Sequence, residues 1–268
     1  MLSIVVSSHN KSFFNALTKN IEHTCGTVTE IIKIDNPGTM GLCKAYNKGA
    51  LQASFPNILF LHEDVEFREK NWGQRLINHL NDAETGIIGL AGSSYVPVAP
   101  SGWFIAKQKN NSQKTKAFAV DGVFLAMRLK HFKEFSFNEN VQGFHGYDLD
   151  ISLRVAKKYN NYIVNDILID HFSAGKPNQQ WLDNNIQIRK NIGNTYQNVI
   201  NSTLEKTAYI NFVKAYFSYY KITSTNILKT FEFYPFTKIK LNDHFEILKM
   251  YYFLLKYRKM YHKKYKSI

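Results

Sequence analysis

The chain has 268 residues, of which 44% are hydrophobic and 21% charged, so it can bury a sizeable core and is not a disordered polypeptide. Its two cysteines, Cys25 and Cys43, form neither a CxxC pair nor a metal-finger spacing, which argues against a disulfide-stapled secreted scaffold and favours a reducing cytoplasm. The formal net charge is +13, and residues 201–268 carry 13 Lys and Arg against 4 Asp and Glu, which places +9 of it in the last quarter.

Short apolar runs alternate with amphipathic segments in the N-terminal part of the chain. The first run, Leu2–Ser7, follows no basic segment, so it predicts a strand that starts the fold rather than a signal peptide. The other predicted strands and the helices between them are Thr29–Ile34, Asn57–Leu61 and Gly86–Leu90, with helices over residues 12–23, 41–54 and 71–82. This alternation predicts an α/β fold with a mostly parallel sheet flanked by helices.

Polar loops follow three of the predicted strands. These loops are residues 7–10, 35–38 and 62–64. Ligands bind at the carboxyl ends of the strands in such a sheet, so we expect the three loops to meet in space. Ser7, Asn10 and Asp35 are then candidates for contacts with a nucleobase or a ribose.

Glu63 and Asp64 directly follow a buried strand. Hard divalent cations such as Mg²⁺ or Mn²⁺ prefer oxygen ligands, often one or two carboxylates together with diphosphate oxygens. An acidic pair in this position can equally well cap the next turn. His171, at the end of a predicted strand over Asn161–Asp170, becomes a metal ligand only if the strand brings it beside Asp64.

Asp148 and Asp150 begin a predicted helix over Asp148–Lys158. The helix dipole favours carboxylates in that position by ~0.3–1 kcal/mol each, so helix capping explains both residues without any function. The alternative is that one of them is a general base for an acceptor hydroxyl. Gly143 and Gly146, just before the helix, would allow close approach of the backbone to that acceptor.

Residues 97–117 are predicted to form a long loop, a feature that is usually functional or disordered. Trp103 within it is either a sugar-stacking surface or a core anchor. Val120–Arg128 then resumes an apolar run. The chain contains no GxxxxGK[ST], GxGxxG or GxSxG motif, so the sequence gives no support to a P-loop enzyme, a dinucleotide-binding enzyme or a serine hydrolase.

Taken in order, these segments resemble the GT-A glycosyltransferases, especially family-two-like bacterial enzymes. The resemblance covers residues 1–175, about two thirds of the chain. It rests on the motifs SSHN, IIKIDNPG, GLCKAYNKGALQA, ILFLHEDVEF, DGVFLAMR, GFHGYDLDISLRV and HFSAG. Each motif alone is loose, and their shared order is what makes the resemblance specific. It implies the GT-A fold and inverting transfer from a UDP-sugar or another nucleotide-sugar.

The resemblance also implies roles for individual residues. Asp35 would contact uridine, Asn47 belongs to the family's glycine-to-asparagine helix, and Asp121 takes the acidic position near the donor sugar. With Ser7, Asn10 and Glu63, these residues form the expected nucleotide-sugar site.

The same resemblance assigns the chemistry. Asp64 and His171 would hold Mn²⁺ or Mg²⁺, and Asp148 rather than Asp150 would be the base. The chain departs from the family pattern where His62 replaces the first acid of the DxD motif and where Tyr147 precedes the base.

The basic and aromatic C-terminal region, 199–268, is expected to form a helical extension of the catalytic domain, 1–198. It is predicted to hold two or three helices, the last over residues 242–264, with Phe245, Leu248, Tyr252 and Leu255 on one side. One interpretation is a peripheral contact with the inner face of the cytoplasmic membrane. The alternative is packing on the catalytic domain or on a second subunit.

The leading hypothesis is an inverting glycosyltransferase of bacterial surface polysaccharide or lipooligosaccharide synthesis, acting on a glycan or lipid-linked acceptor. A second hypothesis is a metal-dependent hydrolase that uses His62, Asp64, His145 and His171 as ligands. A third is a basic membrane or nucleic-acid adaptor without catalytic activity, although no nucleic-acid recognition motif accompanies the basic residues.

Overall fold

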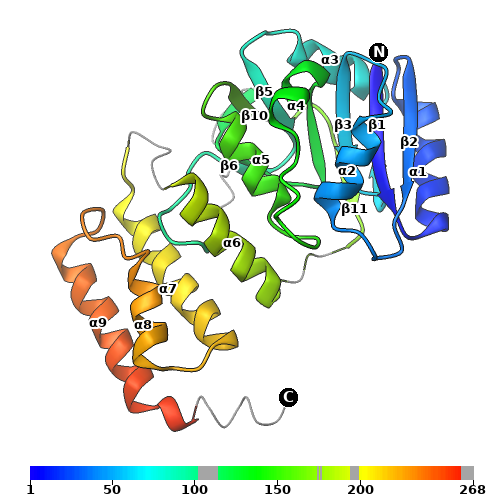
Figure 1. The fold of residues 1–268 in the computed structure, drawn as a ribbon. Helices are drawn as coiled ribbons and strands as arrows, with labels where there is room; N and C mark the ends of the chain where they lie inside the picture. Colours follow the sequence, from blue (N-terminus) through cyan, green and yellow to red (C-terminus); the bar gives the residue numbers. More distant parts are fainter. Residues whose placement is uncertain (102–113, 174, 176, 194–198, 261–268) are drawn as a thin grey trace. The chain divides into compact units, whose positions relative to one another are not determined.

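The computed structural model describes residues 1–101, 114–173, 175, 177–193 and 199–260 (Figure 1). The chain divides into two compact units. The first comprises Met1–Tyr95 and Trp103–Asn184, and the second comprises Val96–Gly102 and Asn185–Ile268. The predicted boundary after residue 198 lies beyond this division, past helix α6 (Gln179–Ile192).

The first unit is built on a sheet with the strand order β2-β1-β3-β9-β5-β10-β7 in the part of the chain that the structure describes. Its strands are β1 (Leu2–Ser8), β2 (Thr29–Asp35), β3 (Asn57–Leu61), β5 (Thr85–Gly89), β7 (Lys114–Ala117), β9 (Phe124–Arg128) and β10 (Asn160–Val164). β1, β2, β3, β5 and β10 run in one direction, while β9 and β7 oppose them. The strands before residue 95 therefore confirm the mostly parallel sheet that the sequence predicts.

Helices cover both faces of this sheet, as a mostly parallel sheet requires (Figure 1). The helices of this unit are α1 (Lys11–Thr24), α2 (Leu42–Ala50), α3 (Trp72–Leu80), α4 (Leu129–Phe135) and α5 (Tyr147–Val155). Successive side chains of a strand point to opposite faces. Ile4 and Val6 of β1 thus join the core with Leu17 of α1 and Leu76 of α3, whereas Val5 faces α2.

Two residues set the close packing of the α2 face. A Cβ atom at Gly49 would lie 2.2 Å from Cγ1 of Val5, so only glycine lets this helix approach β1. Phe60 of β3 packs its ring 5.2 Å from Tyr46 of α2 and 4.8 Å from Phe132 of α4, measured between centroids. Burial of β3 on both faces fixes the direction in which its last residues leave the sheet.

Two small antiparallel sheets extend the strand ends. β4 (Val65–Phe67) pairs with β11 (Ile169–His171), and β6 (Gly92–Ser93) pairs with β8 (Ala119–Val120). The single strand predicted over Asn161–Asp170 is therefore wrong. The chain turns after β10, where Asp166 binds the imidazole of His79 at 2.9 Å, and β11 then runs beside β4 instead of continuing in the main sheet.

The loop predicted over 97–117 is also wrong at its end, because Lys114–Ala117 forms the edge strand β7. The two lysines of this strand make it look like a polar loop in the sequence. Edge strands commonly carry lysines, which limit further pairing. Lys114 places its ammonium 4.0 Å from the ring centroid of Tyr162 on the neighbouring β10. Trp103 lies outside the described residues, so both interpretations of it stay predictions.

The second unit is helical and has its own aromatic core. It contains α7 (Ser202–Tyr219), α8 (Ser224–Phe231) and α9 (Leu241–Lys256), which confirms a helical C-terminal region. Tyr209 of α7 hydrogen-bonds Tyr251 of α9 at 2.6 Å between hydroxyl oxygens, and Glu205 accepts a hydrogen bond from the backbone N–H of Val98. None of the helices within the described ranges has the length and apolar character needed to cross a bilayer.

Candidate active site

The site is organised by the end of β3, where His62, Glu63 and Asp64 leave the sheet. The chain continues at once into β4, which pairs with β11 so that Val65 lies opposite His171. The backbone N–H of Phe172 also donates to the carbonyl of Asp64 at 3.0 Å. This short ladder brings a histidine that is distant in sequence beside the strand-end carboxylate.

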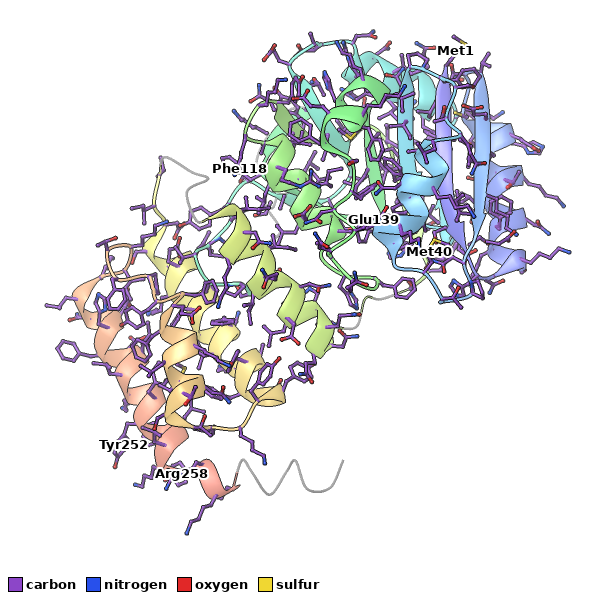
Figure 2. The ribbon with its side chains drawn as sticks, in the orientation of Figure 1. Met1, Met40, Phe118, Glu139, Tyr252 and Arg258 are labelled. Atoms are coloured by element: carbon purple, nitrogen blue, oxygen red, sulfur yellow. The ribbon has the colours of Figure 1, made fainter. Side chains whose placement is uncertain are left out.

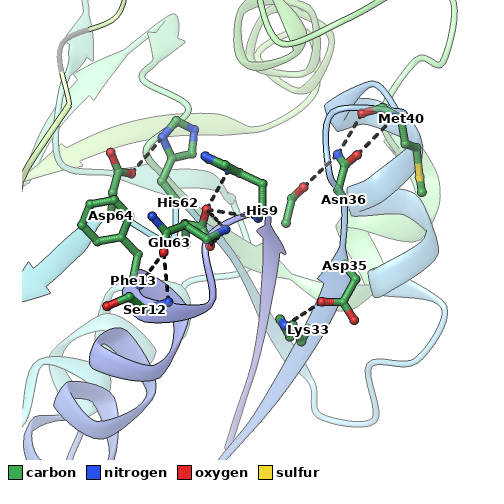
Figure 3. A network of polar contacts seen from close by, with 12 residues as sticks. His9, Ser12, Phe13, Lys33, Asp35, Asn36, Met40, His62, Glu63 and Asp64 are labelled. Atoms are coloured by element: carbon green, nitrogen blue, oxygen red, sulfur yellow. Dashed lines mark hydrogen bonds and ion pairs between the residues drawn. The ribbon is translucent and has the colours of Figure 1, made fainter.

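His62, Asp64 and His171 form a group whose ligand atoms all lie within 4.8 Å of one another, among the described residues. Nε2 of His171 is 3.5 Å from Oδ2 of Asp64. Nδ1 of His62 is 3.9 Å from Oδ1 of the same carboxylate (Figure 3). Two imidazoles and one carboxylate suit manganese-class ions better than Mg²⁺, which prefers oxygen ligands. The donor set thus fits a divalent transition metal.

Tyr147 determines how His62 faces this group. The Tyr147 hydroxyl donates to the carbonyl oxygen of Gly122 at 3.0 Å and lies 2.9 Å from Nε2 of His62. A phenol has one proton, so the hydroxyl must accept from Nε2–H, which assigns this tautomer and leaves the Nδ1 lone pair toward Asp64. Burial lowers the pKa of His62, which favours the neutral imidazole that a metal requires.

We call His62, Asp64 and His171 the metal-competent group. Glu63 faces away from this group and holds the loop after β1. Its buried carboxylate accepts from the backbone N–H groups of His9 and Asn10, at 3.1 and 3.0 Å, and lies 2.8 Å from Nδ1 of His9. Figure 3 shows Glu63 surrounded by these donors. These bonds connect the residues just before α1 to the end of β3.

Asp148 lies in the first turn of α5, after Gly146, whose φ of 87° is one that L side chains rarely adopt. Oδ2 of Asp148 accepts from the backbone N–H of Gly122 at 3.2 Å, and Oδ1 accepts from that of Leu149 at 2.9 Å. Burial, followed by the negative charge of Asp121, raises the pKa of the Asp148 carboxyl to about 7. A carboxylate with such a pKa is suited to general base catalysis near neutral pH.

Asp150, the other acid of this turn, has a different environment. Its buried side chain accepts from Nε of Arg154 at 2.8 Å and forms an ion pair with the same guanidinium. Arg154 in turn donates to the carbonyl oxygen of Ser136. Asp150 therefore fastens α5 to the segment after α4.

A cavity of about 420 Å³ opens beside the metal-competent group. Its lining includes the predicted residues Ser7, Glu63 and Asp64. It also includes Phe13, Asn36, Tyr46 and Phe144, for which the sequence predicts no role in the site. Asn36 donates from Nδ2 to Oγ of Ser7 at 3.1 Å and to the carbonyl oxygen of Met40 at 2.8 Å. Phe13 is 39% and Phe144 46% exposed, so these two rings offer stacking surfaces for a planar ligand.

Three predicted residues, Asn10, Asp35 and Asn47, are not part of this lining. Asp35 is exposed and forms an ion pair with Lys33 at 2.6 Å, in a different direction from Asn36 (Figure 3). The Asn10 side chain accepts from the N–H groups of Ser12 and Phe13 and so caps α1. Asn47 binds the backbone of Phe137 through both its amide atoms.

Asp121 and His171 share the lining of a second cavity of about 320 Å³. Oδ1 of Asp121 accepts from the backbone N–H of Val123, which fixes the carboxylate at the start of β9. His145 is not one of the group of three possible metal ligands within the described residues. The cluster required by the hydrolase hypothesis is therefore incomplete.

The sheet, the polar strand ends around a cavity and the histidine-carboxylate group together assign the chain to the class of the GT-A glycosyltransferases. The chain belongs to the glycosyltransferase-like family, whose model matches residues 3–206. The match confirms the fold and the enzyme class predicted from the sequence. No curated protein matches the chain.

Solved structures with the same fold are distant in sequence. GalNAc-T7 with UDP, GalNAc and Mn²⁺ is 13% identical, with a TM-score of 0.57 over 71% of this chain and 47% of that chain, so this chain spans about half its length. The mannosyltransferase PcManGT from Pyrobaculum calidifontis, in complex with GDP-Man and Mn²⁺, is 9% identical, with a TM-score of 0.53 over 98% and 82%. S. aureus TarS 1–349 with UDP-GlcNAc is 10% identical, with a TM-score of 0.50 over 87% and 79%.

Proposed function

We propose that this protein is an inverting glycosyltransferase that moves a sugar from a UDP-sugar, or another nucleotide-sugar, to a hydroxyl group of a glycan or lipid-linked acceptor. The observation that carries this proposal is a chain of hydrogen bonds from the base to the metal-competent group. Asp148 accepts from Gly122 N–H, the Gly122 carbonyl accepts from Tyr147, and the Tyr147 hydroxyl accepts from His62. The base and His62 are thus held by one glycine residue and one tyrosine.

Asp64 and His171 are the proposed metal ligands, with His62 as the third through Nδ1. A divalent cation held there would neutralise the negative charge that builds on the departing diphosphate. The adjoining cavity, with Phe13 and Asn36 in its lining, is the proposed position of the nucleoside. GalNAc-T7 and PcManGT, whose structures contain Mn²⁺ with a nucleotide, support this assignment by their shared fold.

Asp148 is the proposed general base. Its carboxylate takes the proton from the acceptor hydroxyl while the acceptor oxygen forms a bond to the anomeric carbon. The bond from that carbon to the diphosphate oxygen breaks, and the electron pair leaves with the nucleoside diphosphate. Because the acceptor attacks from the face opposite the leaving group, the configuration at the anomeric carbon inverts.

Substitution of the base tests this assignment. Asp148→Asn is expected to abolish sugar transfer, measured as release of nucleoside diphosphate with acceptor present, while calorimetry still detects nucleotide binding. Asp166→Asn is a matched control, since Asp166 binds His79 and contacts no proposed catalytic group. Full transfer by Asp148→Asn would disprove the base assignment.

The biological setting belongs to the same proposal. We place the enzyme in the cytoplasm, in bacterial surface polysaccharide or lipooligosaccharide synthesis, with the basic C-terminal region in peripheral contact with the membrane that carries the acceptor. The cysteine usage and the +9 charge of residues 201–268 support this setting.

A further inference from the structure

Helix α9 has apolar side chains on two different sides. One side is buried in the second unit and includes Ile247, Tyr251 and Leu254. The other side is solvent-exposed and consists of five large apolar residues, which we call the outer stripe: Leu241, Phe245, Leu248, Tyr252 and Leu255. The residues of the outer stripe are four or three positions apart, a spacing that aligns them along one face of a helix.

The outer stripe is unusually exposed for its chemistry. Leu241 is 73% exposed, Phe245 64%, Tyr252 58%, Leu248 52% and Leu255 45%. Scattered exposed apolar residues are normal, whereas a continuous apolar row marks an interaction site. Figure 2 shows side chains on the side of α9 that lies away from α7 and α8, where Tyr252 is labelled.

Charged residues are arranged unequally around α9. Lys249 and Lys256 each follow a leucine of the outer stripe by one position, so they flank the same edge of it, about 100° around the helix. Both lysines are exposed, and Lys256 places its ammonium 5.8 Å from the ring centroid of Tyr252. Arg258 and Lys259 follow directly after the helix. The edge of the outer stripe is therefore cationic.

The acidic residues of α9 are paired with a lysine of α7, although Glu246 follows Phe245 by one position and so lies on the same edge as Lys249 and Lys256. Asp243 and Glu246 both form ion pairs with Lys206 of α7, at 2.8 and 2.9 Å. An apolar row with aromatic members and a cationic edge has the chemistry of a helix that lies in the interface of an anionic bilayer.

We propose that α9 is an interfacial helix whose outer stripe inserts into the surface of an anionic lipid bilayer, with Lys249 and Lys256 at the headgroups. This inference deepens the proposed membrane contact by naming the helix face that makes it, and it is independent of the catalytic assignment. The enzyme would thus be held at the surface where a lipid-linked acceptor is embedded.

Flotation of the full-length protein with lipid vesicles tests the inference. Vesicles of phosphatidylcholine mixed with phosphatidylglycerol are expected to bind the protein, more weakly at high salt, and vesicles of phosphatidylcholine alone are expected to bind it less. Phe245→Ser combined with Leu248→Ser should remove binding to both. Lys249→Gln combined with Lys256→Gln should weaken binding to the mixed vesicles about 30-fold, from about 1 kcal/mol per lysine.

Leu228→Ser is the matched control, because Leu228 is 68% exposed in the same unit but lies on α8, outside the outer stripe. It should bind the mixed vesicles like the wild type. Thermal unfolding checks that every variant is folded, and nucleotide binding without vesicles should be unchanged in all of them, which separates this test from the catalytic one.

Two results would overturn the inference. One is a wild-type protein that fails to bind the mixed vesicles, or a Phe245→Ser/Leu248→Ser variant that binds them as the wild type does. The other is a dimer, measured by light scattering, that the same double variant converts to a monomer, because a second copy would then cover the outer stripe.

Discussion

The hydroxyl of Tyr147 lies 2.9 Å from Nε2 of His62, and this contact assigns the tautomer of the histidine. The same hydroxyl donates to the Gly122 carbonyl, so it accepts a proton from Nε2 and directs Nδ1 toward Asp64. Outer partners of metal-binding histidines commonly fix ring orientation in this way. A Cβ atom at Gly122 would lie 2.2 Å from the tyrosine hydroxyl, so the contact also requires glycine.

Tyr147→Phe should therefore weaken Mn²⁺ binding in the presence of UDP by about 10- to 100-fold, as loss of such a partner typically does. Calorimetry measures the affinity, and ¹⁵N chemical shifts of the His62 ring measure the tautomer, which a merely structural role would not change. Tyr159→Phe, which loses the bond from the tyrosine hydroxyl to Glu134 outside the site, is the control. Unchanged Mn²⁺ affinity together with an unchanged His62 tautomer in Tyr147→Phe would refute the assignment.

The raised pKa of Asp148 predicts a pH dependence with a definite sign. Below pH about 7 the carboxyl is protonated and cannot accept the acceptor proton, so kcat/KM should fall about tenfold per pH unit on the acidic side and level off above it. Asp121→Asn removes the negative charge that adds to this shift, so its acidic limb should move to lower pH. An acidic limb at the same pH in both proteins would argue against Asp148 as the titrating base.

Glu63→Gln tests the structural assignment of the buried carboxylate. The substitution weakens the acceptor of two backbone N–H groups, so urea unfolding should show a loss of about 1–3 kcal/mol. Mn²⁺ affinity should change little, since Glu63 lies outside the group of His62, Asp64 and His171. Glu66→Gln, at an exposed position of β4, is the control. A loss of Mn²⁺ binding with unchanged stability would instead make Glu63 a ligand.

The fold could be predicted where hydrophobic patterning is long and regular. The strand at Asn57–Leu61 has the predicted bounds, and its neighbours differ by a residue or two. The strands β4 and β11 each have three residues, too few for a periodic pattern, so the ladder that brings His171 to Asp64 was not predicted as a structure. The proximity of His171 to Asp64 is still a prediction of the sequence, because the resemblance assigns both residues to one metal site.

Side-chain direction at strand ends was the part that sequence could not determine. A shift of one residue exchanges the two faces of a strand, and the structure directs Asn36 rather than Asp35 into the cavity. Phe13 reaches the same cavity from the first turn of α1, without any motif that would have marked it, and His9 reaches it from the loop that carries the SSHN motif. The exposure of the outer stripe likewise required the structure, since helical spacing alone does not tell which apolar face is buried.

The most direct test of the central claim is a calorimetric titration of UDP, GDP and CDP into the protein with Mn²⁺ and with EDTA. We predict that one nucleoside diphosphate binds with Mn²⁺, and that EDTA or Asp64→Asn weakens its binding at least about tenfold, because a metal held by Asp64 would also attract the diphosphate. Absence of binding by any of the three, or equal binding with EDTA, would contradict a metal-dependent nucleotide-sugar site at the end of β3.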